Sequence, residues 1–407
     1  MPAIKPIKVG LIGSGAISYT YLQNMTQNFH ILDVVGCSDI VPEKSARRAE
    51  QFNIRQMTNE EIFNDPEIQI VVNTTYPISH YEVTRQALEA GKHVHTEKML
   101  AENFEDGKKL YDLAKAKGLR LSCAPDTFLG GAIQTALKLI KDGYIGKVIT
   151  GQALILRGYK NQGPYEFGPN RPGGMYAHGS AIPYDMGGYY SHALLALLGP
   201  VKRLSGFGVK VPQPFMNVAH PRYGEVYIPE QPTTMTTALE FESGVIGNLT
   251  VSGEIYGETP RVEIYGTDGC LIVPDPNNYS GPLLFSRSGS NKFMEIPLTH
   301  WYNPGNRVDR SAEVAAARAA GDRAELEKLA WQDSRRGIGV ADLAYAITNN
   351  RPHRCSAEMG LSAMEIIYGT EKSCEEGIVY NMTTKMVQPK PLRAGFVGGA
   401  AEGVLDD

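Results

Sequence analysis

The chain has 407 residues, of which 42% are hydrophobic and 21% charged, so it can bury a sizeable core and is not a disordered chain. Its formal net charge of −4 argues against a protein that binds nucleic acid through counterion release. This length predicts two or three domains.

The five cysteines are scattered and form no Cys-x-x-Cys pair, so we expect reduced thiols, no disulfide framework and no structural zinc site. No apolar stretch is long enough to span a bilayer, and no apolar signal segment stands before the first predicted strand. We therefore expect a cytoplasmic protein with no membrane partner.

The first part of the chain alternates predicted strands and helices. The predicted strands are Ile7–Ile12, Ile31–Ser38, Ile68–Asn73, Val94–Thr96 and Leu119–Ser122. The predicted helices between them are Ile17–Phe29, Glu43–Phe52, Tyr81–Ala90 and Phe104–Lys117. This order predicts a parallel sheet with helices on both faces, in which ligands bind at the carboxyl ends of the strands.

A glycine-containing turn joins the first strand to the first helix. Gly13 permits a sharp turn, and Gly15 lets the backbone approach a phosphate group. This arrangement places a pyrophosphate at the N-terminus of a helix. Ser18 occupies the third glycine position, and an ordinary surface turn between a strand and a helix has a similar pattern.

Asp39 ends the second predicted strand, about twenty residues beyond the turn, where an acid can bind both hydroxyls of the adenosine ribose. Its charge would repel a 2′-phosphate, so NAD is favoured over NADP. An aspartate that caps the next helix, before Pro42, is the alternative. Arg47 and Arg48 lie nearby and leave NADP open.

After Asp126 the predicted strands recur without regular helices between them. They are Val148–Arg157, Val201–Val211, Thr233–Phe241, Val245–Val251, Arg261–Tyr265 and Cys270–Val273. Hairpin signals at Ser243-Gly244 and at 267–269 predict a mostly antiparallel sheet in an α+β half. The expected divisions are a first domain at 1–125, a second at 126–388, and a tail at 389–407.

Two further stretches carry the predicted chemistry: Gly91–Met99 and Tyr184–Pro200. Together with the glycine turn, they resemble the glucose-fructose oxidoreductase/inositol dehydrogenase (Gfo/Idh/MocA) family of NAD(P)-dependent dehydrogenases over nearly the whole chain. Segments 75–80, 125–131 and 336–342 add to the resemblance. It implies an N-terminal Rossmann domain and a C-terminal α/β domain whose open sheet often builds the oligomer, so we expect a homodimer or a homotetramer.

Lys98 matches the lysine of the family's Glu-Lys-Pro signature, which implies a place beside the nicotinamide and the reacting hydroxyl. A cation there can donate a hydrogen bond to the alkoxide that forms, and a buried site with the positive oxidised nicotinamide nearby would lower the pKa of the lysine and help proton exchange. An exposed lysine on a turn is the alternative. Met99 stands where the family usually has proline. If that proline adopts a cis bond, methionine is not expected to copy it.

Helix spacing predicts that Asp185, Tyr189 and His192 share one face. Asp185 matches the active-site acid of the family, and Tyr189 falls where many members have a catalytic histidine and some have tyrosine. We expect the hydroxyl proton to pass to Tyr189 or His192 while Lys98 stabilises the alkoxide. The alternatives are a helix cap for Asp185, core packing for Tyr189 and a hydrogen-bonded structural histidine for His192.

The predicted cofactor-binding residues follow the turn and the strand ends: Gly13, Gly15, Ala16, Ile17, Asp39, Thr75, Pro77, His80, Glu97, Lys98 and Asp126. Between Arg157 and Tyr184, aromatic, amide and guanidinium groups suit a sugar ring, although an irregular loop has the same composition. The substrate residues predicted there are Tyr159, Arg171, Tyr176 and His178. His93 and His95 lack a third ligand, so no metal is expected.

These features predict an NAD-dependent dehydrogenase that oxidises a secondary hydroxyl of a sugar, polyol or glycoside to a ketone. The expected partner is a small carbohydrate or polyol substrate. A redox-assisted lyase or glycosidase that retains its NAD, and a sensor that binds dinucleotide and sugar without catalysis, are the alternatives. The titratable cluster favours an enzyme, because binding alone does not need one.

Overall fold

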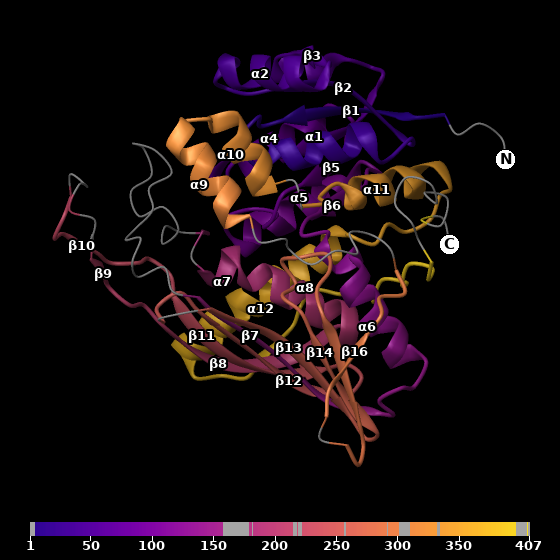
Figure 1. Ribbon diagram of the computed structural model, residues 1–407, viewed down its shortest axis with the longest axis vertical. Helices are drawn as coiled ribbons and strands as arrows, with labels where there is room; N and C mark the ends of the chain where they lie inside the picture. Colours follow the sequence, from indigo (N-terminus) through magenta and orange to yellow (C-terminus); the bar gives the residue numbers. More distant parts are fainter. Residues whose placement is uncertain are drawn as a thin grey trace.

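Two β-sheets organise the chain, and a layer of helices lies between them (Figure 1). The computed structural model describes residues 5–157, 179–180, 182–214, 218, 222–255, 258–290, 292–300, 310–331, 334–395 and 405. The predicted substrate residues Tyr159, Arg171, Tyr176 and His178 lie outside these described residues.

Within the described chain the first sheet has six strands, all parallel, in the order β3-β2-β1-β4-β5-β6. They are β1 (Ile7–Ile12), β2 (Leu32–Ser38), β3 (Arg55–Gln56), β4 (Ile68–Asn73), β5 (His93–Thr96) and β6 (Leu121–Cys123). This Rossmann order reverses direction between β1 and β4, which opens a crevice at the carboxyl ends of these two strands. Gly13 and Thr74 follow them directly.

The helices of this half confirm the predicted alternation of strands and helices. They are α1 (Ser18–Gln27), α2 (Pro42–Phe52), α3 (Asn59–Asn64), α4 (Pro77–Glu89) and α5 (Phe104–Ala116). Helix α3 was not predicted, although its capping box is visible in the sequence: Thr58 accepts from the backbone N–H of Glu61, and the Glu61 side chain accepts from that of Thr58.

The second sheet, as far as the described residues show, has nine strands in the order β16-β15-β14-β13-β7-β12-β11-β8-β17. They are β7 (Val148–Arg157), β8 (Val201–Val209), β11 (Thr234–Phe241), β12 (Ile246–Ser252), β13 (Glu258–Gly266), β14 (Gly269–Val273), β15 (Leu283–Arg287), β16 (Met294–Ile296) and β17 (Tyr380–Asn381). The prediction of a mostly antiparallel sheet is confirmed. The pairing of β7 with β12 is parallel. Strands β9 (Gln213–Pro214) and β10 (Val226–Tyr227) form a separate ribbon.

The remaining helices cover one face of the second sheet or return to the first domain. They are η1 (Thr127–Leu129), α6 (Gly131–Lys141), α7 (Ile182–Asp185), α8 (Gly187–Leu198), α9 (Ser311–Ala320), α10 (Arg323–Trp331), α11 (Ile338–Thr348) and α12 (Ala357–Glu376). Figure 1 shows α6, α8 and α12 between the second sheet and the first domain, whereas α9 and α10 lie beside the N-terminal helices. No helix in the described ranges is long and apolar enough to cross a membrane.

Asp126, predicted as a cofactor ligand, ties the two halves of the chain together. It is fully buried, and its Oδ2 accepts hydrogen bonds from the backbone N–H groups of Gly337 at 2.8 Å and Gly339 at 3.0 Å. Its Oδ1 accepts from the hydroxyl of Tyr279. A carboxylate at the start of α11 satisfies backbone donors that have no partner inside that helix. The segment that follows β6 is therefore hydrogen-bonded to the start of α11.

We expect Asp126→Ala to lower the free energy of unfolding by about 3 kcal/mol, because it leaves buried backbone donors without an acceptor. Asp126→Asn retains a side-chain oxygen and should lose less. Urea denaturation measures both variants. The NAD affinity of the folded variants should stay within a few-fold of the wild type. A variant of normal stability that no longer binds NAD would contradict this structural role.

Candidate active site

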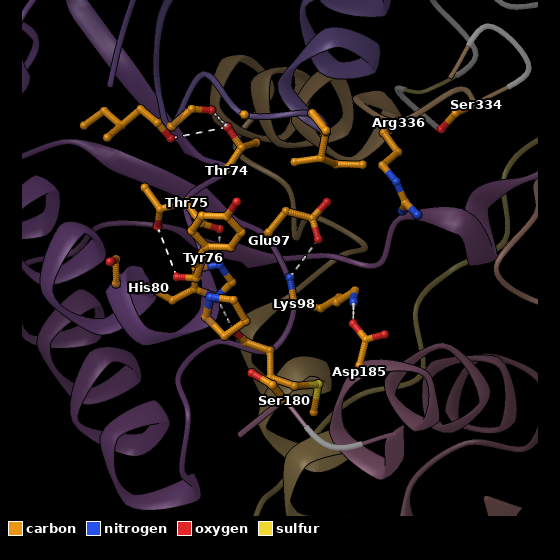
Figure 2. Close-up of a pocket in the computed structure, with 18 of the residues that line it drawn as sticks. Thr74, Thr75, Tyr76, His80, Glu97, Lys98, Ser180, Asp185, Ser334 and Arg336 are labelled. Carbon is orange, nitrogen blue, oxygen red and sulfur yellow. Dashed lines mark hydrogen bonds and ion pairs between the residues drawn. The ribbon is translucent and has the colours of Figure 1, made fainter. Parts of the chain in front are cut away.

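A cavity of about 770 Å³ joins the two halves of the chain. This volume lies within the range usual for small-molecule sites. The first domain contributes the turn after β1 and the loops after β2, β4 and β5, and the second contributes α7, the start of α8 and the segment before α11. Figure 2 shows Thr74, Thr75 and His80 in one part of this cavity, with Lys98, Asp185 and Arg336 in another.

The glycine turn has the geometry that a dinucleotide requires. Gly13 has a φ of +101°, and a Cβ there would lie 2.7 Å from the backbone of Thr74 and Thr75, so no other residue fits. A Cβ on Gly15 would meet nothing within 4 Å, which leaves the backbone open to a phosphate. The Asp39 carboxylate accepts from the backbone N–H groups of Ser14 at 2.7 Å and Val41 at 2.9 Å. It is therefore fixed beside the turn.

Most of the predicted cofactor-binding residues lie in the wall of this cavity. They are Gly13, Gly15, Ala16, Ile17, Asp39, Thr75, Pro77, His80, Glu97 and Lys98. Asp126 is the exception, because it points to the start of α11. His80 joins two of the loops: its Nδ1 lies 2.7 Å from the carbonyl oxygen of Met99, and its Nε2 lies 3.0 Å from that of Thr75.

Arg48, which the sequence left available for a 2′-phosphate, is fully engaged within the protein. Its side chain is buried, and it donates to the Ser18 hydroxyl and to the Gly15 carbonyl, each at 3.0 Å. Its two terminal nitrogens both donate to Glu327 of α10. Ser18, in the third glycine position, therefore serves as a contact for this arginine. Arg47 lies 3.7 Å from the same glutamate.

Lys98 pairs with Asp185 across the cavity. Its ammonium donates to the Asp185 carboxylate and lies 5.2 Å from the ring centroid of Tyr189. Burial by itself lowers the pKa of Lys98, but the charges of Asp185, Tyr189 and Glu97 outweigh burial, and the net shift is upward. The protein's own groups therefore do not lower the pKa of Lys98, because Asp185 stabilises the ammonium form. Asp185 therefore favours the cationic, hydrogen-bond-donating form of Lys98.

Methionine at position 99, where the family usually has proline, does not move Lys98 out of the cavity wall. The peptide bond between Lys98 and Met99 is cis, so the expectation that methionine would not copy a cis proline was wrong. The side chain of Met99 is buried, and Lys98 reaches Asp185 from the end of β5.

His192 lies away from the cavity wall, whereas Asp185 and Tyr189 both line it. The His192 Nδ1 donates to the carbonyl of Gly188 at 2.7 Å, and the ring stacks on Phe128 with centroids 6.5 Å apart. Burial lowers the pKa of His192 to about 4. Asp185 and Tyr189 share the cavity face as predicted, whereas His192, three residues beyond Tyr189 on α8, does not.

Arg336 is one of the cavity residues that the sequence did not identify as part of the site. Its side chain is 5% exposed, and its Nη2 donates to the Tyr189 hydroxyl at 2.7 Å and to the Asn277 side-chain oxygen at 3.2 Å. Figure 2 shows it beside Ser334, in the segment that enters α11. The signal in the sequence was an arginine before Gly-Ile-Gly at the start of an apolar helix.

Two sequence profiles match this chain. One is described as an oxidoreductase family with an NAD-binding Rossmann fold and matches residues 7–124. The other is described as a GFO/IDH/MocA C-terminal domain and matches residues 133–272. The chain belongs to the Gfo/Idh/MocA family. This confirms the family resemblance, the oxidoreductase class and the nicotinamide dinucleotide cofactor predicted from the sequence.

Named relatives within the family act on polyols and sugars. A scyllo-inositol 2-dehydrogenase (NAD(+)) of Bacillus subtilis is 26% identical over 66% of this chain and 73% of its own length. A levoglucosan dehydrogenase of Pseudarthrobacter phenanthrenivorans is 26% identical over 65% and 73%, respectively. An uncharacterized oxidoreductase of Schizosaccharomyces pombe is 30% identical over 48% of this chain, and the match spans about half, 52%, of the yeast protein.

Solved structures show the same fold. A levoglucosan dehydrogenase in complex with NADH matches with a TM-score of 0.74 and 19% identity, over 94% of this chain and 100% of that chain.

Among the described residues no group of three or more His, Cys, Asp or Glu could hold a metal ion. His93 accepts from the backbone N–H of Arg120, and His95 lies 2.8 Å from the Ser122 hydroxyl.

We expect His192 to make the fold of this family member sensitive to acid. Below pH 6.5 the unfolded chain binds a proton at this residue that the buried imidazole does not bind, so the free energy of unfolding falls as the pH drops from 6.5 towards about 4. The loss from this group is about 3 kcal/mol. Urea denaturation should show that His192→Gln, which cannot titrate, loses less over the same range. Parallel profiles would contradict this expectation.

Proposed function

We propose that the protein is an NAD-dependent dehydrogenase that oxidises a secondary hydroxyl of a sugar or polyol to a ketone. The observation that carries this proposal is the Lys98–Asp185 pair beside Tyr189, in the same cavity as the glycine turn and Asp39. The names of the inositol and levoglucosan dehydrogenases support the substrate class. A site that only bound sugar would not need this set of titratable groups.

Each residue of the cluster has one part in the reaction. When bound, the nicotinamide ring accepts a hydride from the carbon that carries the hydroxyl. Lys98 donates a hydrogen bond to the substrate oxygen and stabilises the charge that develops there. Asp185 holds the lysine in place and keeps it protonated. Tyr189, which lines the cavity beside Lys98, is the proposed acceptor of the hydroxyl proton in its phenolate form, which the charges of Arg336 and Lys98 favour against the effect of burial, whereas His192 lies outside the cavity.

We expect Lys98→Met to lower kcat by about a hundred- to a thousandfold while the affinity for NAD changes little, since the variant loses stabilisation of the alkoxide. Steady-state kinetics and calorimetric titration with NAD measure the two effects. Lys109→Met is the matched control, because this lysine lies exposed on α5. Full activity of Lys98→Met would contradict the assignment.

Asp39 supports NAD over NADP, because its carboxylate is fixed at the turn and Arg48 is committed to Glu327. We expect Asp39→Ala to lower the ratio of kcat/KM with NAD to kcat/KM with NADP at least about tenfold, since it removes a ribose acceptor and a repulsive charge. Asp33→Ala, an exposed acid on the same strand, should leave the ratio unchanged. An unchanged ratio in Asp39→Ala would contradict the role.

The absorbance of reduced nicotinamide, followed with a panel of inositols, anhydrosugars and glycosides, tests the reaction itself. Stoichiometric reduction of NAD supports the dehydrogenase. Cleavage of a glycoside without net reduction would instead show a lyase or glycosidase that retains its NAD. Saturable binding without turnover by any compound would show a sensor.

A further inference from the structure

Tyr189 is held between two cations that have different partners. Arg336 Nη2 lies 2.7 Å from the Tyr189 hydroxyl oxygen, and Arg336 Cζ lies 5.4 Å from the centroid of its ring. The Lys98 ammonium lies 5.2 Å from the same centroid, but it is paired with Asp185. Among the described residues, only the arginine is hydrogen-bonded to the oxygen atom that would carry the proton.

This contact fixes the direction of the phenol proton. A guanidinium has only N–H donors, so the Tyr189 oxygen accepts from Arg336 and its own hydrogen points elsewhere. Within the part of the chain that the structure describes, this hydroxyl has no second hydrogen-bond partner, and Tyr189 lines the cavity. The remaining capacity of the oxygen is available to a substrate hydroxyl.

Arg336 interacts electrostatically with the Glu97 carboxylate but forms no ion pair with it in the described part of the chain. The residue is 5% exposed, and its Nε and Nη1 atoms are buried with no hydrogen-bond partner. No carboxylate forms an ion pair with it in the described ranges, and its second contact is the neutral side-chain oxygen of Asn277. A buried charge without an ionic partner is costly. A phenolate at Tyr189 would place a negative charge in direct contact with the guanidinium through a charge-assisted hydrogen bond.

The other charges around Tyr189 do not stabilise its phenolate form as Arg336 does. Glu97 and Asp185 oppose deprotonation of the phenol, and Lys98 favours it while being partly neutralised by Asp185. The pKa of Tyr189 is raised overall, because burial outweighs the charges that lower it, of which Arg336 is the strongest. The Glu97 carboxylate accepts from the Tyr21 hydroxyl at 2.8 Å and from the backbone N–H of Lys98.

The surroundings of Arg336 keep it cationic. Burial lowers its pKa, but the charges of Tyr189 and Glu97, with smaller effects of Tyr279 and Tyr21, outweigh burial and raise it. Its backbone is held in place by the next residues, because the N–H groups of Gly337 and Gly339 donate to Asp126.

We propose that Arg336 is a positioning residue that holds Tyr189 as the proton acceptor of the reaction and stabilises its deprotonated form. This rests on the proposed function. In the step it serves, Tyr189 has first lost its own proton to solvent and reacts as the phenolate; the O–H bond of the substrate breaks, and its proton forms a new O–H bond on the Tyr189 oxygen. The electron pair of the substrate C–H bond leaves as hydride to oxidised NAD. The substrate carbon is oxidised, and NAD is reduced.

Asn277→Asp tests the proposal without removing the guanidinium, because it gives Arg336 a carboxylate partner that competes with the phenolate. Arg336→Met removes the cation, and Arg336→Lys retains a charge. In Asn277→Asp and Arg336→Met, the titration of Tyr189 should move to higher pH by about one unit or more, and kcat/KM near neutral pH should fall about tenfold or more. Arg336→Lys should shift the titration less.

Two readouts separate this role from a structural one. Tyrosinate absorbance, taken for each protein as the difference from the same protein carrying Tyr189→Phe, follows the phenol without any substrate. The pH profile of kcat/KM should shift in the same direction, and Asn277→Asp should have no further effect on kcat/KM in the Tyr189→Phe background. Thermal unfolding shows whether each variant is folded.

An unchanged tyrosinate titration in folded Asn277→Asp and Arg336→Met would overturn the proposal. So would an equal loss of activity in the presence and absence of the Tyr189 hydroxyl. If Arg336→Met does not fold, Asn277→Asp decides the question. If the wild type oxidises no polyol, the proposed function fails, but the titration still decides whether Arg336 controls Tyr189.

Discussion

The ion pair between Lys98 and Asp185 defines the candidate site. The lysine follows the fifth strand of the Rossmann sheet, and the aspartate ends a short helix of the second domain. Neither half of the chain contains the pair alone. Because the pair lies in the wall of the cavity, it places the cation where a substrate oxygen could meet a cofactor bound at the glycine turn. The other groups of the cluster are arranged around it.

The parts of the fold that local physics controls could be predicted from the sequence. Apolar runs and glycines at turns predicted the strands of the first sheet except β3 and its helices except α3, and hairpin signals predicted the antiparallel pairs β11–β12 and β13–β14 of the second. The parallel pairing of β7 with β12 could not be predicted, because it depends on where β7 inserts in a sheet whose other strands come later in the chain. Similarly, α8 is buried on every side and has no amphipathic pattern to reveal its neighbours.

The residues of the candidate site also divide into those that could be predicted from the sequence and those that could not. Gly13, Asp39 and Lys98 stand at strand ends, where topology alone directs them to one crevice. Errors arose where a side chain depends on a distant partner. Asp185 outweighs the effect of burial on Lys98 and raises its pKa, and His192, three residues beyond Tyr189 on α8, packs on Phe128 instead of lining the cavity. Arg336 reaches Tyr189 from 147 positions along the chain, a contact that no spacing rule contains.

The buried ion pair between Arg48 and Glu327 determines whether the first domain can keep its native structure when it is separated from the rest of the chain. Arg48 holds the Gly15 carbonyl, yet the carboxylate that balances its charge comes from α10, near the other end of the chain. Removing one partner of a buried ion pair generally costs about 3–5 kcal/mol. A fragment that ends after the sixth strand would keep its whole sheet but leave this cation unbalanced beside the phosphate turn. The dinucleotide-binding half therefore contains a complete fold but not its own counterion, so we expect neither a separately expressed fragment nor a graft onto another catalytic domain to retain the native turn.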